Sequence, residues 1–212
     1  MLVRAHDAPN DDDEWRRIVG AAEVGELIAP GVARVLPIVV PTHFVFDEAG
    51  NDVLVHFAKP NPVWSAIEES AVVLFCVTTA FSFVPGPWNA SPGTDPSWGV
   101  PTSYYATAQL RCTATVIDDA AGLADLLGRL MARFQPEGGS HAVEPGDNPF
   151  GKLLPAIRGL RLHVDEVHAK FKFGGNKAID HRLEIADRLG ARDGSQDAAA
   201  RQHLLRRSRS LG

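Results

Sequence analysis

Hydrophobic and polar residues alternate most regularly between Ser103 and Ile117. Apolar side chains occupy the even positions of this stretch, and most odd positions carry threonine, glutamine or arginine. Because successive side chains of a strand point to opposite faces, the pattern predicts a long antiparallel strand with one wetter face. Apolar residues then recur at helical spacing from Leu123 to Phe134, which predicts a helix that is capped by Asp118 or Asp119.

Further apolar runs of strand length predict the rest of a sheet. A stretch rich in valine, isoleucine and phenylalanine predicts one bent strand or two short ones, and turn residues after it predict a hairpin with the next strand. In the last run the apolar positions change from even to odd near Asp165 and Glu166, which predicts a bulge or kink. The expected strands cover residues 32–46, 52–58, 71–77, 80–84, 103–117 and 160–173.

Helical spacing also predicts an amphipathic helix behind the acidic run at 10–14, a short helix at 150–157 and a helix at 178–192. Within the last helix, Ile179 and Leu183 are expected to face inward with Ala186 and Leu189. A long loop rich in proline and glycine at 85–101 carries two tryptophans, which argue against disorder.

About six strands with inserted helices, and no regular βαβ alternation, predict an antiparallel barrel of the α+β kind. We expect one domain over residues 1–192. The segment at 193–212 carries an excess of arginine and little to bury, so we expect a mobile basic tail.

Composition agrees with a globular chain of 212 residues, with 45% apolar and 22% charged residues. The net charge of −5 argues against general nucleic-acid binding, although the tail is basic. No run of 18 apolar residues and no signal-peptide core is found, so a cytoplasmic location is expected. Cys76 and Cys112 lie in apolar strands, where reduced core thiols are expected.

An anion site is predicted where the strand at 52–58 ends. Lys59 follows the strand, and Asn61 and Pro62 have the residue types favoured at a helix start. Backbone N–H groups at a helix N-terminus, together with a lysine ammonium, favour a phosphate. A solvated loop lysine before a surface helix is the alternative.

Other chemistry finds little support in the sequence. The histidines show no metal-ligand spacing, so no metal site is predicted. No Gly-x-Ser-x-Gly motif is found, and Gly174-Gly175-Asn176 lacks the three-glycine spacing of a dinucleotide fingerprint. The two glycines do permit close backbone approach by another group.

Four blocks in the same order resemble a known family. They are His56 to Trp64, Phe81 to Trp88, Val100 to Tyr105 and Lys170 to Asn176. Across roughly residues 15–190 the chain resembles the FMN-binding split-barrel proteins known as negative transcriptional regulators of the PaiB type, related to the pyridoxamine-phosphate-oxidase-like superfamily.

The resemblance implies a six-stranded antiparallel Greek-key split barrel, a homodimer, and FMN held at the subunit interface. By position it implies that these residues bind the cofactor: His56, Phe57, Ala58, Lys59, Asn61, Trp64, Thr102, Ser103, Tyr104, Lys172 and Asn176. The family often has Ser-Gln where this chain has Gly174-Gly175, and Trp-Asn-Tyr where it has Ser103-Tyr104-Tyr105. The amino-terminal His-Phe motif of the regulators is absent, which argues against the regulator role more than against the fold.

Two functions follow from these patterns. The first is an FMN-dependent oxidoreductase that takes a small-molecule substrate or electron donor, with no catalytic acid or base assigned. The second is a flavin- or haem-binding regulator that contacts a macromolecule, with nucleic acid as the less favoured partner and the basic tail as the contact. The sequence leaves both functions open.

Overall fold

The alternating apolar runs fold into the strands of one sheet. In the computed structural model, which describes residues 1–209, the seven strands follow the order β2-β1-β5-β6-β7-β4-β3. Their bounds are β1 (Val24–Ala29), β2 (Ile38–His43), β3 (Val45–Asp47), β4 (Asp52–Ala58), β5 (Val72–Val84), β6 (Thr102–Ile117) and β7 (Ile157–Lys172). The open antiparallel sheet with its helices is split-barrel-like, so the predicted fold class is confirmed, with one strand more than expected.

The chain divides into two units, which are described separately. Unit 1 comprises Met1–Ile18, Thr78–Ala108 and the described residues from His168 onward. Unit 2 comprises Val19–Val77 and Gln109–Val167. Strands β5, β6 and β7 run from one unit into the other, as does helix α1 (Asp12–Ala21).

Unit 2 holds β1 to β4 and their pairings with β5 and β7. Strand β4 pairs with β3 in the predicted hairpin, in which Asn51 has a positive φ of 54°, and with β7 on its other side. Helix α4 (Ala120–Phe134) begins at Asp119, whose Oδ1 accepts from the Gly122 N–H at 2.8 Å, as predicted. Its Leu126 and Leu130 pack on Leu54 of β4. The short helix α2 (Val63–Glu69) follows β4, and the 3₁₀ turn η3 (Leu154–Ala156) precedes β7.

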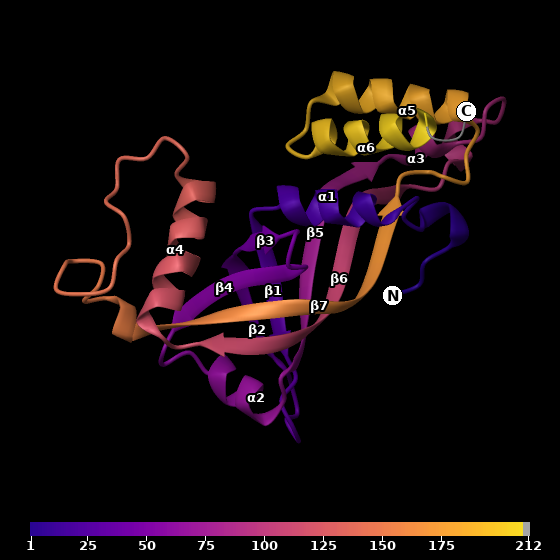
Figure 1. Ribbon diagram of the computed structural model, residues 1–212. Coiled ribbons are helices and arrows are strands. Elements are labelled where there is room, and N and C mark those ends of the chain that lie inside the picture. The colour runs from indigo at the N-terminus through magenta and orange to yellow at the C-terminus, as the bar shows by residue number, and fades with distance from the viewer. Residues whose placement is uncertain (210–212) are drawn as a thin grey trace. The chain divides into compact units, whose positions relative to one another are not determined.

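Unit 1 adds helices to the ends of the three long strands. The helices α5 (Ile179–Arg192) and α6 (Asp197–Arg209) lie side by side (Figure 1). The buried Asp197 fixes their connection, because it accepts from Ser82 Oγ at 2.6 Å and from two nitrogens of Arg192. The loop between β5 and β6 contains α3 (Gly86–Asn89) and the 3₁₀ turn η2 (Pro96–Trp98), and η1 (Ala5–Asp7) lies near the amino terminus.

Four predictions about individual elements are wrong. Strand β1 was not expected, because two of its three buried positions are the small residues Gly25 and Ala29, which give a weak apolar pattern. The runs at 71–77 and 80–84 form one strand, in which the buried side chains change from odd to even positions and Ala80 takes a positive φ of 55°. Residues 150–157 form only the turn η3 before β7 begins. Helix α5 buries Ala186 and Leu189 as expected and also Arg182 and Ile185, whereas Ile179 and Leu183, which were expected to face inward, are 42% and 38% exposed.

The segment after residue 193 also differs from the prediction. It folds into α6, in which Ala200 and Leu204 are completely buried, so the view that it has nothing to pack is wrong. Residues 210–212 of the predicted tail lie outside the described residues. The division of the chain into a domain and a tail at residue 192 stays a prediction, although α6 packs against α5 within unit 1.

Other features agree with the sequence. Cys112 is buried, Cys76 is half-buried, and both are free thiols. Burial raises the pKa of the Cys76 thiol to about 11 and that of Cys112 to about 12. In β7 the buried side chains change from even to odd positions across Asp165 and Glu166, as expected. Within the range that the structure describes, no helix is long and apolar enough to cross a membrane.

Candidate functional site

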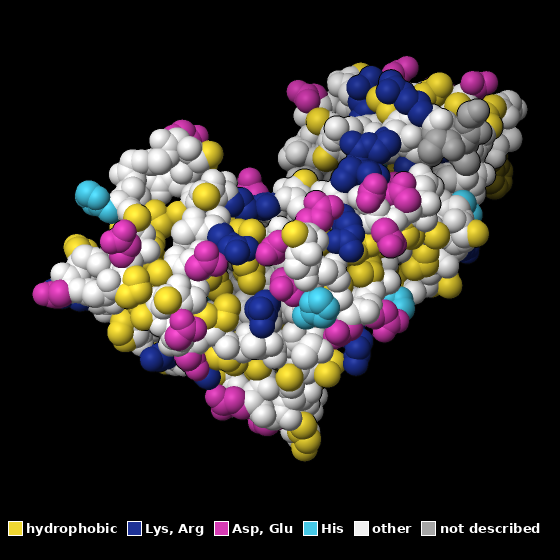
Figure 2. All heavy atoms as spheres, in the orientation of Figure 1, with side chains coloured by type: hydrophobic (Ala, Val, Ile, Leu, Met, Phe, Trp, Pro, Cys, Tyr) yellow, Lys and Arg dark blue, Asp and Glu magenta, His cyan; other side chains and the backbone are white. Residues whose placement is uncertain are grey.

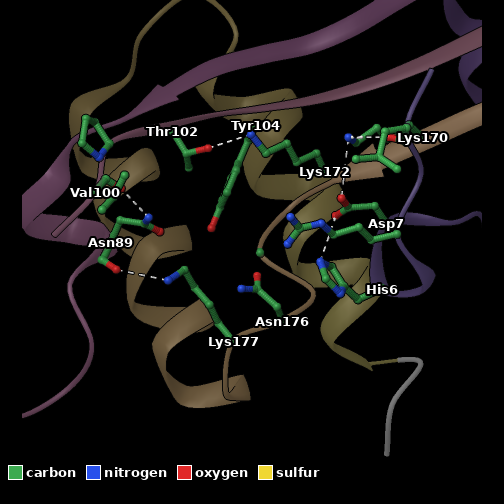
Figure 3. Close-up of a pocket in the computed structure, with 14 residues that line it drawn as sticks. His6, Asp7, Asn89, Val100, Thr102, Tyr104, Lys170, Lys172, Asn176 and Lys177 are labelled. Carbon is green, nitrogen blue, oxygen red and sulfur yellow. Dashed lines mark hydrogen bonds and ion pairs between the residues drawn. The ribbon is translucent and has the colours of Figure 1, made fainter.

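A cavity of about 510 Å³ lies in unit 1, where β6 begins and β7 ends (Figure 3). Its size is typical of small-molecule sites. All of its lining residues belong to unit 1 and come from the amino-terminal segment, the β5–β6 loop, the two strands and the turn after β7. Those that carry polar side chains are Arg4, His6, Asp7, Asn89, Thr102, Tyr104, Lys170, Lys172, Asn176 and Lys177.

The strand ends place two of these groups in direct contact. Lys172, the last residue of β7, donates from Nζ to the Thr102 hydroxyl on β6 at 2.7 Å. The same ammonium lies 6.0 Å from the centre of the Tyr105 ring. Lys172 is half-buried and makes no ion pair with a carboxylate in the part of the chain that the structure describes. It can therefore offer its charge to a ligand.

The turn after β7 brings a second lysine to the cavity. Lys177 Nζ donates to the backbone oxygen of Asn89 at 3.1 Å, and burial lowers the pKa of this ammonium. Asn176 projects between Lys177 and His6 (Figure 3). The turn lies against its neighbours, since a Cβ on Gly175 would come within 2.3 Å of the His6 backbone oxygen. The close approach predicted for the two glycines is confirmed.

The amino-terminal segment closes one side of the cavity. Lys170 Nζ donates to the Leu2 oxygen at 2.9 Å and lies 3.8 Å from the buried Asp7 carboxylate. Asp7 is the single carboxylate in the lining, against Arg4, Lys170, Lys172 and Lys177. Four cations less one carboxylate leave a net charge of +3 with the histidine neutral, which favours an anionic ligand.

Tyr104 is the most deeply buried polar group of the lining, at 1% exposed. Figure 3 shows its hydroxyl pointing into the space near Asn89, Asn176 and Lys177. This hydroxyl has no hydrogen-bond partner among the described residues. Burial raises the pKa of Tyr104 to about 12, so the group stays a neutral donor at physiological pH. A buried unsatisfied hydroxyl costs free energy unless a ligand provides the partner.

Six of the other predicted site residues lie in unit 2, around the end of β4. The Asn61 side chain accepts from the Val63 N–H at 2.9 Å, but the N-cap of α2 is Pro62 and the helix begins at Val63, so the predicted helix start is one residue too early. Trp64 is buried, and its ring N–H donates to the Ala58 oxygen at 2.9 Å. Phe57 packs edge-on against Trp64 at 5.9 Å. These contacts stabilise the end of the strand.

Lys59 is exposed, and both acidic and basic side chains lie in the region around it. The pKa of the Asp118 carboxyl is lowered mainly by hydrogen bonds from Arg158. The nearby charge of Lys59 lowers this pKa further. Arg158 also binds Glu68 at 3.0 Å and lies 4.8 Å above the Trp64 ring. Arg158 lies near the start of β7 opposite Phe57 and was not expected at this place, because it belongs to no sequence motif.

His56, on the same strand, is half-buried and packs against His43 with ring centres 5.5 Å apart. Its Nδ1 is buried and unpartnered in the described part of the chain. Burial lowers the pKa of His56, and the nearby His43 adds to the effect. His56 is therefore a neutral ring in the sheet at neutral pH.

The structure brings four of the predicted cofactor residues to one cavity. They are Thr102, Tyr104, Lys172 and Asn176. Ser103 lies between two of them on β6 but is not in the lining. The six predicted residues that fall between positions 56 and 64 lie in unit 2. Arg4, Asn89 and Lys177 were missed. Lys177 adjoins the recognised Lys170–Asn176 block, whereas nothing in the sequence linked residues 1–7 to β7.

Comparison with known proteins identifies the family of this chain. Residues 1–166 match the model of the "Putative FMN-binding domain" family, so the chain belongs to that family. The cofactor is therefore a flavin. Lys172, Asn176 and Lys177 lie beyond the matched range. Comparison with curated protein sequences gives no significant match.

Solved structures support the same fold. The chain is similar to the FAD and heme binding protein from Mycobacterium smegmatis, with 22% identity, a TM-score of 0.59, and coverage of 84% of this chain and 78% of that chain. It is also similar to the flavocytochrome Anf3 from Azotobacter vinelandii, with 18% identity, a TM-score of 0.57, and coverage of 78% and 69%. At these identities the likeness concerns the fold alone.

Proposed function

We propose that the protein is an FMN-dependent oxidoreductase. A bound flavin accepts hydride or electrons at its ring and passes them on, while the protein binds and orients the reactants. Family membership supports the cofactor. The single observation that carries the proposal is the cationic cavity, because it joins four of the predicted cofactor residues, one of which is Tyr104 with its buried hydroxyl.

The residues present fit the phosphate of FMN. Lys172 and Lys177 supply positive charge, and the hydroxyls of Thr102 and Tyr104 supply neutral hydrogen bonds. Charge-assisted hydrogen bonds of this kind are the strong ones. We therefore place the phosphate in the cavity of unit 1.

Lys59 is the competing anchor, because it was predicted from the strand end and from the resemblance. Its side chain is exposed and shares its surroundings with Asp118. The N–H of Val63, the first residue of α2, already donates a hydrogen bond to the Asn61 side chain. Both features reduce the attraction for a phosphate, since a neighbouring carboxylate repels it and a capped N–H cannot donate to it.

The two anchors are separated by comparing FMN with riboflavin, which lacks the phosphate. We expect Lys172→Ala to weaken FMN binding by about ten- to hundredfold and to leave riboflavin binding unchanged. Lys59→Ala should have a smaller effect. Lys152→Ala, which removes an exposed lysine paired with Asp147, is the matched control. If Lys59→Ala alone discriminates between the two flavins, the phosphate lies in unit 2.

We also propose that the protein forms a homodimer. Phe81 and Phe83 on β5 are 55% and 53% exposed, and the Phe81 ring stacks on Tyr105 of β6. A contiguous exposed aromatic surface of this kind favours burial against another copy of the chain.

A flavin- or haem-binding regulator of the PaiB type is the alternative proposal. Arginine side chains gather over α5 and α6 (Figure 2), and Arg206 and Arg209 are exposed, which favours an acidic partner. Arg207 instead forms a buried ion pair with Glu14 at 2.6 Å, so it serves the fold. Retardation of DNA by a protein that no reductant turns over would support this alternative.

A further inference from the structure

The amino-terminal segment at residues 2–7 forms one wall of the cavity in unit 1. Four of its residues belong to the lining: Leu2, Arg4, His6 and Asp7. We propose that this segment is a lid, which Lys170 latches in the closed position and which opens to let a ligand exchange. The inference goes beyond the proposed function, and only its last step, the effect of FMN on the lid, rests on that function.

The lid has little hydrophobic packing to hold it in place. Within residues 1–209 the buried apolar side chains begin only at Trp15. Leu2 is 74% exposed, and the one buried residue of the lid is Asp7. Segments that bury few apolar groups open at a low free-energy cost, while the strands beside them stay folded. The closed position of the lid therefore depends on polar contacts.

One ammonium group holds both ends of the lid. Lys170 Nζ donates to the Leu2 oxygen at 2.9 Å and lies 3.8 Å from Asp7 Oδ2 (Figure 3). The side chains of Lys170 and Asp7 are 13% and 8% exposed. Salt screens a partly buried pair of this kind much less than it screens a surface pair. Lys170 is therefore the latch.

The lid is attached to the rest of unit 1 at Ala8. Arg207 Nη2 donates to the Ala8 oxygen at 2.8 Å, and Arg207 Nη1 pairs with the buried Glu14 at 2.6 Å. The contact of Arg207 with the His6 oxygen, inside the lid, is longer, at 3.4 Å. Arg207 thus fixes the chain where the lid ends, and the lid can swing about this point.

An occupied cavity should keep the lid closed. Arg4 and His6 belong to the lining of the closed cavity, so a ligand there gains contacts that the open state lacks. A ligand that binds one state better shifts the equilibrium towards that state. We therefore expect FMN to protect the lid from opening, and a weakened latch to release FMN faster.

Trypsin cleavage after Arg4 measures the opening of the lid in the full-length protein without any ligand. The protease needs an extended chain, whereas in the closed lid the Asp7 N–H donates to the Arg4 oxygen at 2.8 Å. When the lid recloses quickly, the cleavage rate follows the population of the open state. Cleavage after Lys152, whose side chain is 65% exposed in unit 2, gives the reference rate within the same molecule.

We expect Asp7→Asn and Lys170→Met each to raise the rate of cleavage after Arg4 about tenfold. The double variant should match Lys170→Met, because both changes remove the same ion pair. Lys170→Met leaves the sequence around Arg4 unchanged, so the sequence preference of trypsin cannot explain its effect. Asp13→Asn removes an exposed carboxylate of α1 and should match the parent. Thermal melting shows whether each variant is folded.

The release of FMN gives a second readout, in which a lid and simple charge have opposite effects. Asp7→Asn removes the single carboxylate of the cavity lining, so charge alone would make an anionic ligand leave more slowly. A lid without its latch makes the ligand leave faster. Recovery of flavin fluorescence after dilution measures this dissociation rate, and FMN should also slow the cleavage of the parent after Arg4.

The inference is overturned if folded Asp7→Asn and Lys170→Met are cleaved after Arg4 no faster than the parent, or if the parent is cleaved there as fast as after Lys152. Slower release of FMN from Asp7→Asn than from the parent would also refute it. A parent that takes up no FMN would contradict the proposed function, and the trypsin rates would still decide the lid.

Discussion

Protonation of His203 should weaken unit 1 in mild acid. This α6 residue is 9% exposed and stacks on Phe173 behind the Tyr104 wall of the cavity. Burial lowers the pKa of His203 to about 4, and the cations Arg206, Arg207 and Arg17 add to this effect against the opposing Glu14. The imidazole is therefore neutral in the folded protein at neutral pH.

The size and sign of the effect follow from linkage. The unfolded chain takes up a proton near the ordinary histidine value of 6.5, whereas the folded chain does so only near 4. Between these values the unfolded state binds more protons, so stability falls as the pH falls. The difference corresponds to about 3 kcal/mol. For a chain of this length it should lower the Tm by about 6–12 °C.

His203→Phe provides the assay, because phenylalanine keeps an aromatic ring against Phe173 and cannot be protonated. Thermal melting followed by circular dichroism between pH 7.5 and 4.5 should give a steeper fall for the parent than for the variant. The difference between the two curves isolates His203 from the carboxylates that titrate in both proteins. Parallel curves would refute the reasoning.

Three further predictions concern packing and assembly. Asp197→Asn should lower stability by about 1.5–3 kcal/mol, because it removes the charge that binds Arg192; chemical denaturation measures it. The pKa of Asp197 is lowered mainly by that arginine, so its contribution is present above pH 4 and is lost as the pH falls further, and the variant should lose less stability there than the parent. Truncation after Arg192 should destabilise unit 1, because Leu204 and the Arg207–Glu14 pair are lost, and an unchanged Tm would contradict the role given to α6. Light scattering should give a dimer, about twice the 22.8 kDa chain mass, and a monomer would refute the aromatic interface.

Much of the fold could be predicted because its long elements have strong periodicity. The even–odd alternation of β6 and the helical spacing of α4 predicted both elements within a few residues. Helix α6 could not be predicted in this way, because it contains many arginines and only a few small or apolar residues that pack in unit 1. Its sequence therefore shows no clear apolar face. Arg207 is buried only because Glu14, distant in sequence, meets it. Such a pairing depends on tertiary structure and leaves no local pattern.

The candidate site shows the same limit. Lys172 and Asn176 could be identified from their block, and the structure places both in the cavity lining. The contribution of Arg4 and Asp7 could not, because residues 1–7 reach β7 only in the folded chain through the Lys170 contact with Leu2. The close approach of Gly174 to the Tyr104 hydroxyl likewise exists only in the folded chain, because Gly174 lies in the turn after β7 and Tyr104 lies on β6.

The central claim is that this chain is a flavoprotein that carries out redox chemistry. An absorption spectrum of the purified protein, followed by anaerobic addition of a reduced nicotinamide cofactor, tests it most directly. We predict a yellow protein with flavin absorption bands that bleach on addition of the donor and return with air. A colourless protein that takes up no added FMN would contradict the account.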